Sequence, residues 1–125
     1  MTRRELIDYC LTLPAVYEDY PFDDGAAHSG DGAWTVMRHR TNKKGFAHIY
    51  KRNGKLCVNL KCDPFEADFL RRAFVDISPA YHMNKTHWLG ITIGGDVSEN
   101  ELKRMVGNSY DLIKPRERIG LWADL

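Results

Sequence analysis

The chain of 125 residues contains 43% hydrophobic and 28% charged residues and carries a formal net charge of +1. This composition is typical of a single globular domain and excludes a disordered chain. No apolar run approaches the roughly 18 residues of a membrane-spanning helix, and the N-terminus is typical of a helix start rather than a signal peptide. Three cysteines favour a reducing compartment over a disulfide framework. We therefore expect a cytoplasmic monomer without cofactor or membrane partner.

The charges are segregated along the chain. Residues 1–32 carry seven acidic and two basic residues, whereas residues 33–62 carry eight basic residues and no acidic one. Residues 63–125 carry ten acidic and eight basic residues. The middle block therefore creates a local basic field that the neutral total hides.

The first half of the chain predicts one helix and three strands. Thr2 and Glu5 form a capping-box pattern before apolar residues at helical spacing, which predicts a helix that ends near Pro14. Residues 14–33 are rich in glycine, proline and acidic residues and predict a connecting segment, with a short strand as an option at residues 26–29. Aromatic and β-branched residues predict strands at 34–40, 46–52 and 55–61.

Asn53 and Gly54 predict a tight hairpin, because both central residues of a type I′ turn need a positive φ angle. Arg52 then lies opposite Lys55, and side chains alternate between the two faces of the sheet. We expect one face to be core and the other to be open, polar and aromatic, with Phe46 on the open side. The expected core pairs are Ile49 with Val58 and Ala47 with Leu60, and the expected open pairs are His48 with Asn59 and Tyr50 with Cys57.

The second half predicts helix, strand, strand and helix. Asp63 and Pro64 are typical of a helix start, and we expect Phe65 and Phe69 on the buried stripe of that helix. Strands follow at 77–83 and 86–93, and a helix runs from Ser98 until Pro115 ends it. The order α-β-β-β-α-β-β-α predicts a two-layer α+β fold, with an antiparallel sheet of about five strands and helices on one face. We expect residues 1–125 to form one domain, with 115–125 as a C-terminal extension.

Metal binding and nucleophilic catalysis find little support in the sequence. Cys57 and Cys62 lack a second pair at zinc-binding spacing, and their opposite parity in a strand points them to opposite faces. We find no nucleophile motif and no phosphate-binding loop. We therefore expect no metal and no enzymatic activity. The alternative is a small-ligand or enzymatic pocket on the open face, formed by His48, Tyr50, Asn59 and His87.

The basic block falls on the predicted hairpins and suggests a nucleic-acid surface. Lysine and arginine displace counterions from phosphates, and aromatic rings stack on exposed bases. A structural role also fits, because lysines at hairpin tips prevent sheet edges from pairing. Carboxylates of the acidic first segment, at Glu18, Asp19, Asp23 and Asp24, could neutralise the block. The candidate nucleic-acid-binding residues are Arg38, Arg40, Lys43, Lys44, Lys51, Arg52, Lys55 and Lys61.

The stretch AYHMNKTHWLGITIGG at residues 80–95 gathers histidine, lysine, asparagine, tyrosine and tryptophan where one predicted strand ends and the next begins. Polar atoms at such a place can tie a turn while the rings pack against the fold. We interpret the stretch as a set of polar contacts that stabilise the fold rather than as a reaction centre. Lys85 could still add to a binding rim.

Four motifs together resemble the MmcQ/YjbR family: LPAVYEDYPF at 13–22, VNLKCDP at 58–64, YHMNKTHW at 81–88 and NSYDLI at 108–113. The resemblance implies an α+β fold of the secretion-chaperone-like type, whose paired hairpins are likened to DNA-binding wings, a "double wing". It implies no catalytic residue. The connection RHRTNKKG is longer than the short glycine turn expected there. The motif and structural residues are Asn59, Lys61, Tyr81, Asn84, Lys85, His87, Trp88, Ser109 and Tyr110.

Our hypothesis is a non-enzymatic protein that binds DNA weakly, mainly through its phosphates, on one shared basic surface, and no sequence specificity is predicted. Its affinity for duplex DNA should fall steeply with salt. The rival hypothesis is a protein- or peptide-binding adaptor that resembles secretion chaperones and uses the open sheet face and the tail at 119–125. That adaptor should bind independently of salt and expose an apolar patch.

Overall fold

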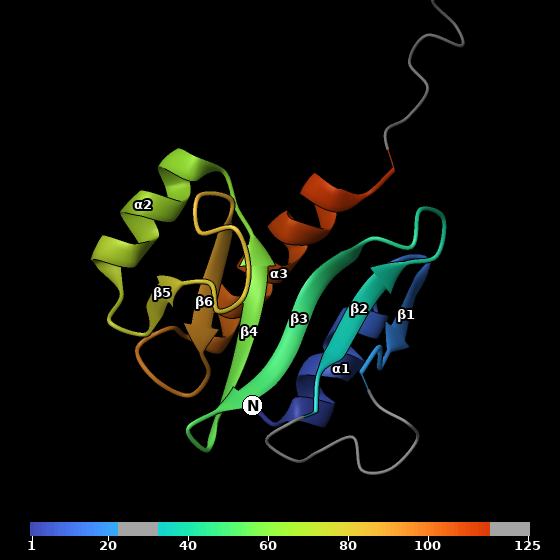
Figure 1. Ribbon diagram of the computed structural model, residues 1–125, viewed down its shortest axis with the longest axis horizontal. Helices are drawn as coiled ribbons and strands as arrows, with labels where there is room; N and C mark the ends of the chain where they lie inside the picture. Colours follow the sequence, from blue (N-terminus) through green and yellow to red (C-terminus); the bar gives the residue numbers. More distant parts are fainter. Residues whose placement is uncertain (23–32, 116–125) are drawn as a thin grey trace, which may run out of the picture.

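Three helices and six strands form two layers in the computed structural model, which describes residues 1–22 and 33–115 (Figure 1). The strands pair antiparallel in the order β1-β2-β3-β4-β6-β5. The predicted α+β class is confirmed, with one strand more than expected. The elements are α1 (Arg3–Leu11), β1 (Val16–Asp19), β2 (Thr35–His39), β3 (Gly45–Arg52), β4 (Lys55–Lys61), α2 (Pro64–Ala73), β5 (Ile77–Pro79), β6 (Trp88–Thr92) and α3 (Glu99–Ile113).

Each helix begins at the cap that the sequence predicts. The Thr2 hydroxyl accepts a hydrogen bond from the backbone N–H of Glu5, and the Glu5 carboxylate accepts one from the backbone N–H of Thr2. Asp63 and Ser98 accept backbone N–H groups in the same way at the starts of α2 and α3. These side chains satisfy N–H groups that have no partner inside the helix, which fixes where each helix starts.

Strand β1 was missed, because its four residues lie in the segment predicted as a connection. Two of them are acidic, a residue type that is depleted in strands. The strand forms because β2 offers a free edge: Val16 pairs with His39, and Asp19 pairs with Val36. Tertiary pairing thus overrides a weak local preference. The strand considered at 26–29 lies outside the described residues.

The β3–β4 hairpin has the predicted register, with Arg52 opposite Lys55 and His48 opposite Asn59. Asn53 and Gly54 have φ angles of 54° and 75°, as a type I′ turn needs. The position of the turn therefore determines which face of the sheet each side chain of the paired residues 47–52 and 55–60 occupies.

The prediction that Phe46 lies on the open face is wrong. The β2–β3 register shifts between Met37 and Arg38, and Phe46 is fully buried against His39 and Tyr110. An irregularity of this kind breaks the strict alternation of faces. Gly45 permits the close approach of the strands here, because a Cβ atom on it would lie 2.5 Å from Cγ1 of Val36.

The core lies between the sheet and two helices. Helices α1 and α3 cover the rear face of the sheet in Figure 1, and the opposite face carries no helix there. Buried residues of α1 and α3 pack against buried residues of β3, β4 and β6. Ala67 and Leu70 of α2 join the same core. The open face of β2 and β3 is therefore the side on which a ligand can approach the sheet.

The predicted buried stripe of α2 is wrong at two positions. Phe65 is 88% exposed and Phe69 is 67% exposed, whereas Ala67 and Leu70 are buried. Phe65 and Phe69, four residues apart, share the side of α2 that faces solvent, whereas Ala67 and Leu70, three residues apart, share the side that faces the core. The following strands are also shorter than predicted, because residues 80–87 form turns between β5 and β6.

None of the helices within residues 1–22 and 33–115 combines the length and apolar character that a bilayer crossing requires.

Candidate functional site

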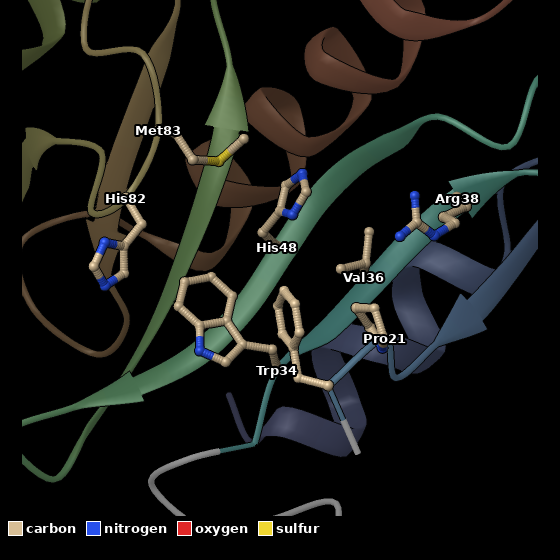
Figure 2. A pocket seen from close by; sticks show the side chains of 8 residues that line it. Pro21, Trp34, Val36, Arg38, His48, His82 and Met83 are labelled. Atoms are coloured by element: carbon tan, nitrogen blue, oxygen red, sulfur yellow. The ribbon is translucent and has the colours of Figure 1, made fainter. Parts of the chain in front are cut away.

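A pocket of about 390 Å³ opens on the helix-free face of β2 and β3 (Figure 2). Trp34, Val36 and Arg38 share this face because strand side chains alternate, and Val36 pairs with His48 of β3. The volume lies within the range of ligand-binding pockets, roughly 300 to 1,000 Å³. The lining residues are Pro21, Phe22, Trp34, Val36, Arg38, His48, His82 and Met83.

Trp34, which lines the pocket, is backed by a buried aromatic ring. The rings of Trp34 and Tyr50 have centroids 4.4 Å apart and planes inclined by 14°. Tyr81 lies beside both rings, at 6.5 Å from Trp34 and 5.9 Å from Tyr50, and His82 contacts Tyr81 at 3.8 Å. Tyr50 is only 3% exposed, whereas Trp34 is half-buried. Trp34 therefore covers Tyr50 and keeps part of its own surface accessible.

The side chain of Asn59 forms hydrogen bonds with both Tyr50 and Tyr81. The side chain is fully buried, its Oδ1 accepts a hydrogen bond of 2.9 Å from the Tyr50 hydroxyl, and its Nδ2 donates one of 2.9 Å to the carbonyl of Tyr81. Burial raises the pKa of Tyr50 to about 12, so its hydroxyl stays a donor at neutral pH. Asn59 thus ties β3 to the turn that carries Tyr81.

Arg38, His48 and His82 are the polar side chains that line the pocket. Arg38 Nε donates to Asp19 Oδ2 at 2.7 Å, and its Nη1 donates to the Lys43 carbonyl at 3.0 Å. Burial lowers the pKa of His48 to about 4, and the Arg38 cation acts in the same direction. His48 is therefore neutral at pH 7, with its ring edge-on to Trp88 at 5.3 Å.

The eight predicted cations do not form one cluster. Arg38, Arg40, Lys43 and Lys44 gather at the β2–β3 turn, and Lys61 lies at the neighbouring end of β4. Arg52 and Lys55 flank the opposite turn. Strand β3 has eight residues, so at about 3.3 Å per residue the two basic ends lie about 25 Å apart. Lys51 points to the opposite face from Arg52, because strand side chains alternate.

Carboxylates neutralise little of this basic surface within residues 1–22 and 33–115. Of the eight cations, Arg38 is the one with an ion pair there, to Asp19. Glu18 pairs with Arg4 of α1 instead. Two cations lie over aromatic rings: Arg52 is 4.1 Å from the centroid of Tyr81, and Arg40 is 5.8 Å from that of Tyr17. Asp23 and Asp24 lie outside the described residues.

Hydrogen bonds within residues 81–88 and to neighbouring elements stabilise the turns between β5 and β6. Asn84 Oδ1 accepts from the backbone N–H groups of Thr86 and His87, and the Asn84 carbonyl accepts from that of Trp88. The Lys85 carbonyl accepts from Arg71, and the His87 carbonyl accepts from the backbone of Cys62. These contacts place Tyr81 and His82 over the sheet.

The motif NSYDLI at residues 108–113 connects α3 to the sheet. Ser109 is fully buried, its hydroxyl donates to the Phe46 carbonyl at 2.6 Å and accepts from the Lys61 N–H at 2.9 Å. The Tyr110 hydroxyl donates to the Pro14 carbonyl at 2.6 Å. Ser109 thereby bridges β3 and β4, and Tyr110 fixes the chain just before β1.

The structure brings only part of the alternative ligand cluster together. His48 lines the pocket, Tyr50 and Asn59 lie buried beneath Trp34, and His87 is exposed and outside the lining. Burial raises the pKa of Cys10 to about 12 and that of Cys62 to about 11, which disfavours a thiolate at either position. Within residues 1–22 and 33–115 no group of three histidine, cysteine or acidic residues could hold a metal ion.

Sequence reasoning missed Trp34, His82 and Phe22 as pocket residues. The alternation of Trp34, Val36 and Arg38 along one strand was a usable signal for the first of them, because all three share the face of His48 once β2 and β3 are paired. Nothing local indicates His82 or Phe22, since each reaches the pocket from a turn whose position depends on the whole fold.

The fold and this surface define a small α+β domain with helices on one sheet face and a hollowed aromatic surface on the other. The family model YjbR matches residues 11–112. The chain therefore belongs to the YjbR family, as the sequence motifs indicated.

The chain is also similar to known relatives and to solved structures. The chain is 28% identical to the uncharacterized protein YjbR of Escherichia coli strain K12, over 88% of this chain and 85% of the relative. It is 27% identical to the uncharacterized protein YyaQ of Bacillus subtilis strain 168, over 91% and 99%. A Pseudomonas syringae crystal structure has a TM-score of 0.76 at 28% identity, over 91% of this chain and all of the other. The Deinococcus radiodurans protein DR2400 has a TM-score of 0.75 at 30% identity, over 90% and 78%.

Proposed function

We propose that this protein binds nucleic acid along the open face of its sheet, without catalysis and without sequence preference, and that its ligand is a single strand. The observation that supports the proposal is the position of the aromatic pocket between two basic ends on one sheet face. Cations that follow a backbone, together with rings that accept bases, are the combination by which proteins hold single strands.

The two basic ends would hold phosphates. Arg40, Lys43 and Lys44 are exposed at one end, and Arg52 and Lys55 are exposed at the other. Each cation that meets a phosphate releases condensed counterions, so affinity falls as salt rises. The distance of about 25 Å between the ends corresponds to about seven nucleotides at the roughly 3.4 Å spacing of a stacked strand.

The rings between these ends favour a single strand over a duplex. In a duplex the bases stack on one another, so that only phosphates, sugars and base edges reach a protein surface. Trp34 and His82 lie in a hollow, where an unpaired base can reach them but a duplex backbone gains no stacking. The basic ends alone would accept either form.

The test is the fluorescence anisotropy of a labelled oligothymidine of about ten nucleotides and of a duplex of similar length, at low salt. We expect tighter binding of the single strand, and a loss of about tenfold or more for Lys43→Glu with Lys44→Glu and for Arg52→Glu with Lys55→Glu. The matched control is Lys103→Glu on α3, which covers the opposite face of the sheet. Absence of binding, or an equal loss in the control, contradicts the proposal.

A protein-binding adaptor is the second candidate, because Phe65 and Phe69 expose two phenyl rings one helical turn apart on α2. Such an adaptor would bind its partner independently of salt. An oligonucleotide that fails to bind at low salt, together with a partner lost on Phe65→Ser with Phe69→Ser, would favour this candidate over nucleic acid.

A further inference from the structure

We propose that the pocket of Figure 2 takes one unpaired nucleobase of the bound strand, with the phosphate of that nucleotide against Arg38. The inference rests on the proposed function and names the chemical unit that the hollow on the open face recognises. The ligand class is thus a nucleotide, a planar heterocycle that carries a nearby anion.

The base would stack on the aromatic wall. One face of the Trp34 indole is occupied by Tyr50, and Trp34 also lines the pocket together with Phe22, which is 78% exposed. Indole and phenyl surfaces attract any base, because every base has a π-face. This wall therefore recognises a base without reading which base it is.

The phosphate would meet Arg38, whose guanidinium is already fixed in place. Its Nε and Nη1 are held by Asp19 and by the Lys43 carbonyl, and its Nη2 has no hydrogen-bond partner within the described part of the chain. A guanidinium suits a phosphate because it is planar, always charged and rich in donors. Arg38 also lies next to the exposed Lys43 and Lys44, so the same backbone can continue over that turn.

The remaining lining suits the edge of a base. His48 is neutral at pH 7, and a neutral imidazole presents one donor and one acceptor nitrogen. His82 also lines the pocket. Its own φ angle is 63°, a backbone conformation that few residues other than glycine adopt. The volume of about 390 Å³ lies at the low end of the range for ligand pockets and fits one nucleotide better than a stacked pair.

Calorimetric titration of the full chain with adenosine monophosphate, adenosine and inorganic phosphate tests the inference. We expect the monophosphate to bind most tightly. Trp34→Ala should weaken it roughly 5- to 150-fold, the loss that removal of a stacking ring gives, and Trp34→Phe should restore part of it. Arg38→Gln should remove the preference for the monophosphate over adenosine. Phe65→Ala, an exposed ring outside the pocket, is the control and should change nothing.

A second readout needs no variant. In a ¹⁵N-resolved NMR titration with adenosine monophosphate, signals of Trp34, His48 and His82 should shift together while those of Phe65 and Phe69 stay. Absence of binding at millimolar nucleotide, or shifts confined to other residues, overturns the inference. If the strand still binds and still depends on Lys43 and Lys44, only the pocket assignment fails. If the nucleotide binds but the strand does not, the proposed function fails and the pocket assignment stands.

Discussion

The indole ring of Trp34 stacks on the phenol ring of Tyr50, with ring centroids 4.4 Å apart. The inner ring is buried and is tied through its hydroxyl to Asn59, whereas the outer ring borders the pocket. The outer ring is therefore held in position before any ligand arrives. A ligand that stacks on it does not have to order a free side chain, which lowers the entropic cost of binding.

Loss of the Tyr50 hydroxyl should weaken this support. Tyr50→Phe leaves Oδ1 of the fully buried Asn59 without its donor, and an unsatisfied buried acceptor costs about 1 to 3 kcal/mol of unfolding free energy. Urea denaturation measures the change. Tyr17→Phe, on a half-buried ring of β1, is the comparison and should cost less than about 0.5 kcal/mol. A loss of less than about 0.5 kcal/mol in Tyr50→Phe would show that Asn59 does not depend on Tyr50.

Ser109 should contribute more to the free energy of unfolding than the small size of its side chain suggests. Ser109→Ala removes the hydroxyl that donates to the Phe46 carbonyl and accepts from the Lys61 N–H, so two backbone groups each lose a hydrogen bond. We expect a loss of about 2 to 4 kcal/mol in the free energy of unfolding, measured with urea. Ser78→Ala, at an exposed position on β5, is the matched control and should be close to neutral. A neutral Ser109→Ala would mean that water replaces the hydroxyl.

His48 should make stability depend on pH. Its pKa is about 4 in the folded protein and about 6.5 in the unfolded chain, so between these values the unfolded chain binds more protons. Stability should therefore be constant with respect to this group above pH 6.5 and should fall as the pH drops towards 4, by up to about 3 kcal/mol. Denaturation of the protein and of His48→Gln from pH 7 to pH 4.5 measures this. The decline should be shallower in the variant, and parallel curves would contradict the assignment.

The phenyl rings of α2 should contribute little to stability, because they are exposed. Phe65→Ser and Phe69→Ser should each change the free energy of unfolding by less than about 0.5 kcal/mol. Leu70→Ala on the same helix should cost about 2 to 5 kcal/mol, because its side chain is buried. A loss of about 2 to 5 kcal/mol at Phe65 or Phe69 would contradict this and would support the buried stripe that the sequence pattern predicted.

Local signals in the sequence were sufficient for most of the fold. The caps at Thr2, Asp63 and Ser98 and the turn at Asn53 act within a few residues, so the helix starts and the β3–β4 register could be predicted. Strand β1 could not, because it exists through pairing with β2 rather than through its own residues. Phe46 was misplaced for a similar reason, since the irregularity that buries it arises between two strands.

The candidate site was harder to predict than the fold. Charge counting found the cations, but it could not show that they separate into two ends of β3. The hairpin register placed His48 and Tyr50 on the open face, yet Trp34 needed the register of a second strand pair. His82 and Tyr81 needed the position of a turn that Asn59 holds through one side-chain hydrogen bond.

The salt dependence of oligothymidine binding tests the central claim most directly. For single strands the plot of log affinity against log salt falls with a slope of about −0.7 for each phosphate contact. Lys43→Glu with Lys44→Glu should therefore reduce the slope by about 1.4 and weaken binding at low salt. Binding that is absent at low salt, or a slope that this double substitution leaves unchanged, would contradict a nucleic-acid strand on the open face of the sheet.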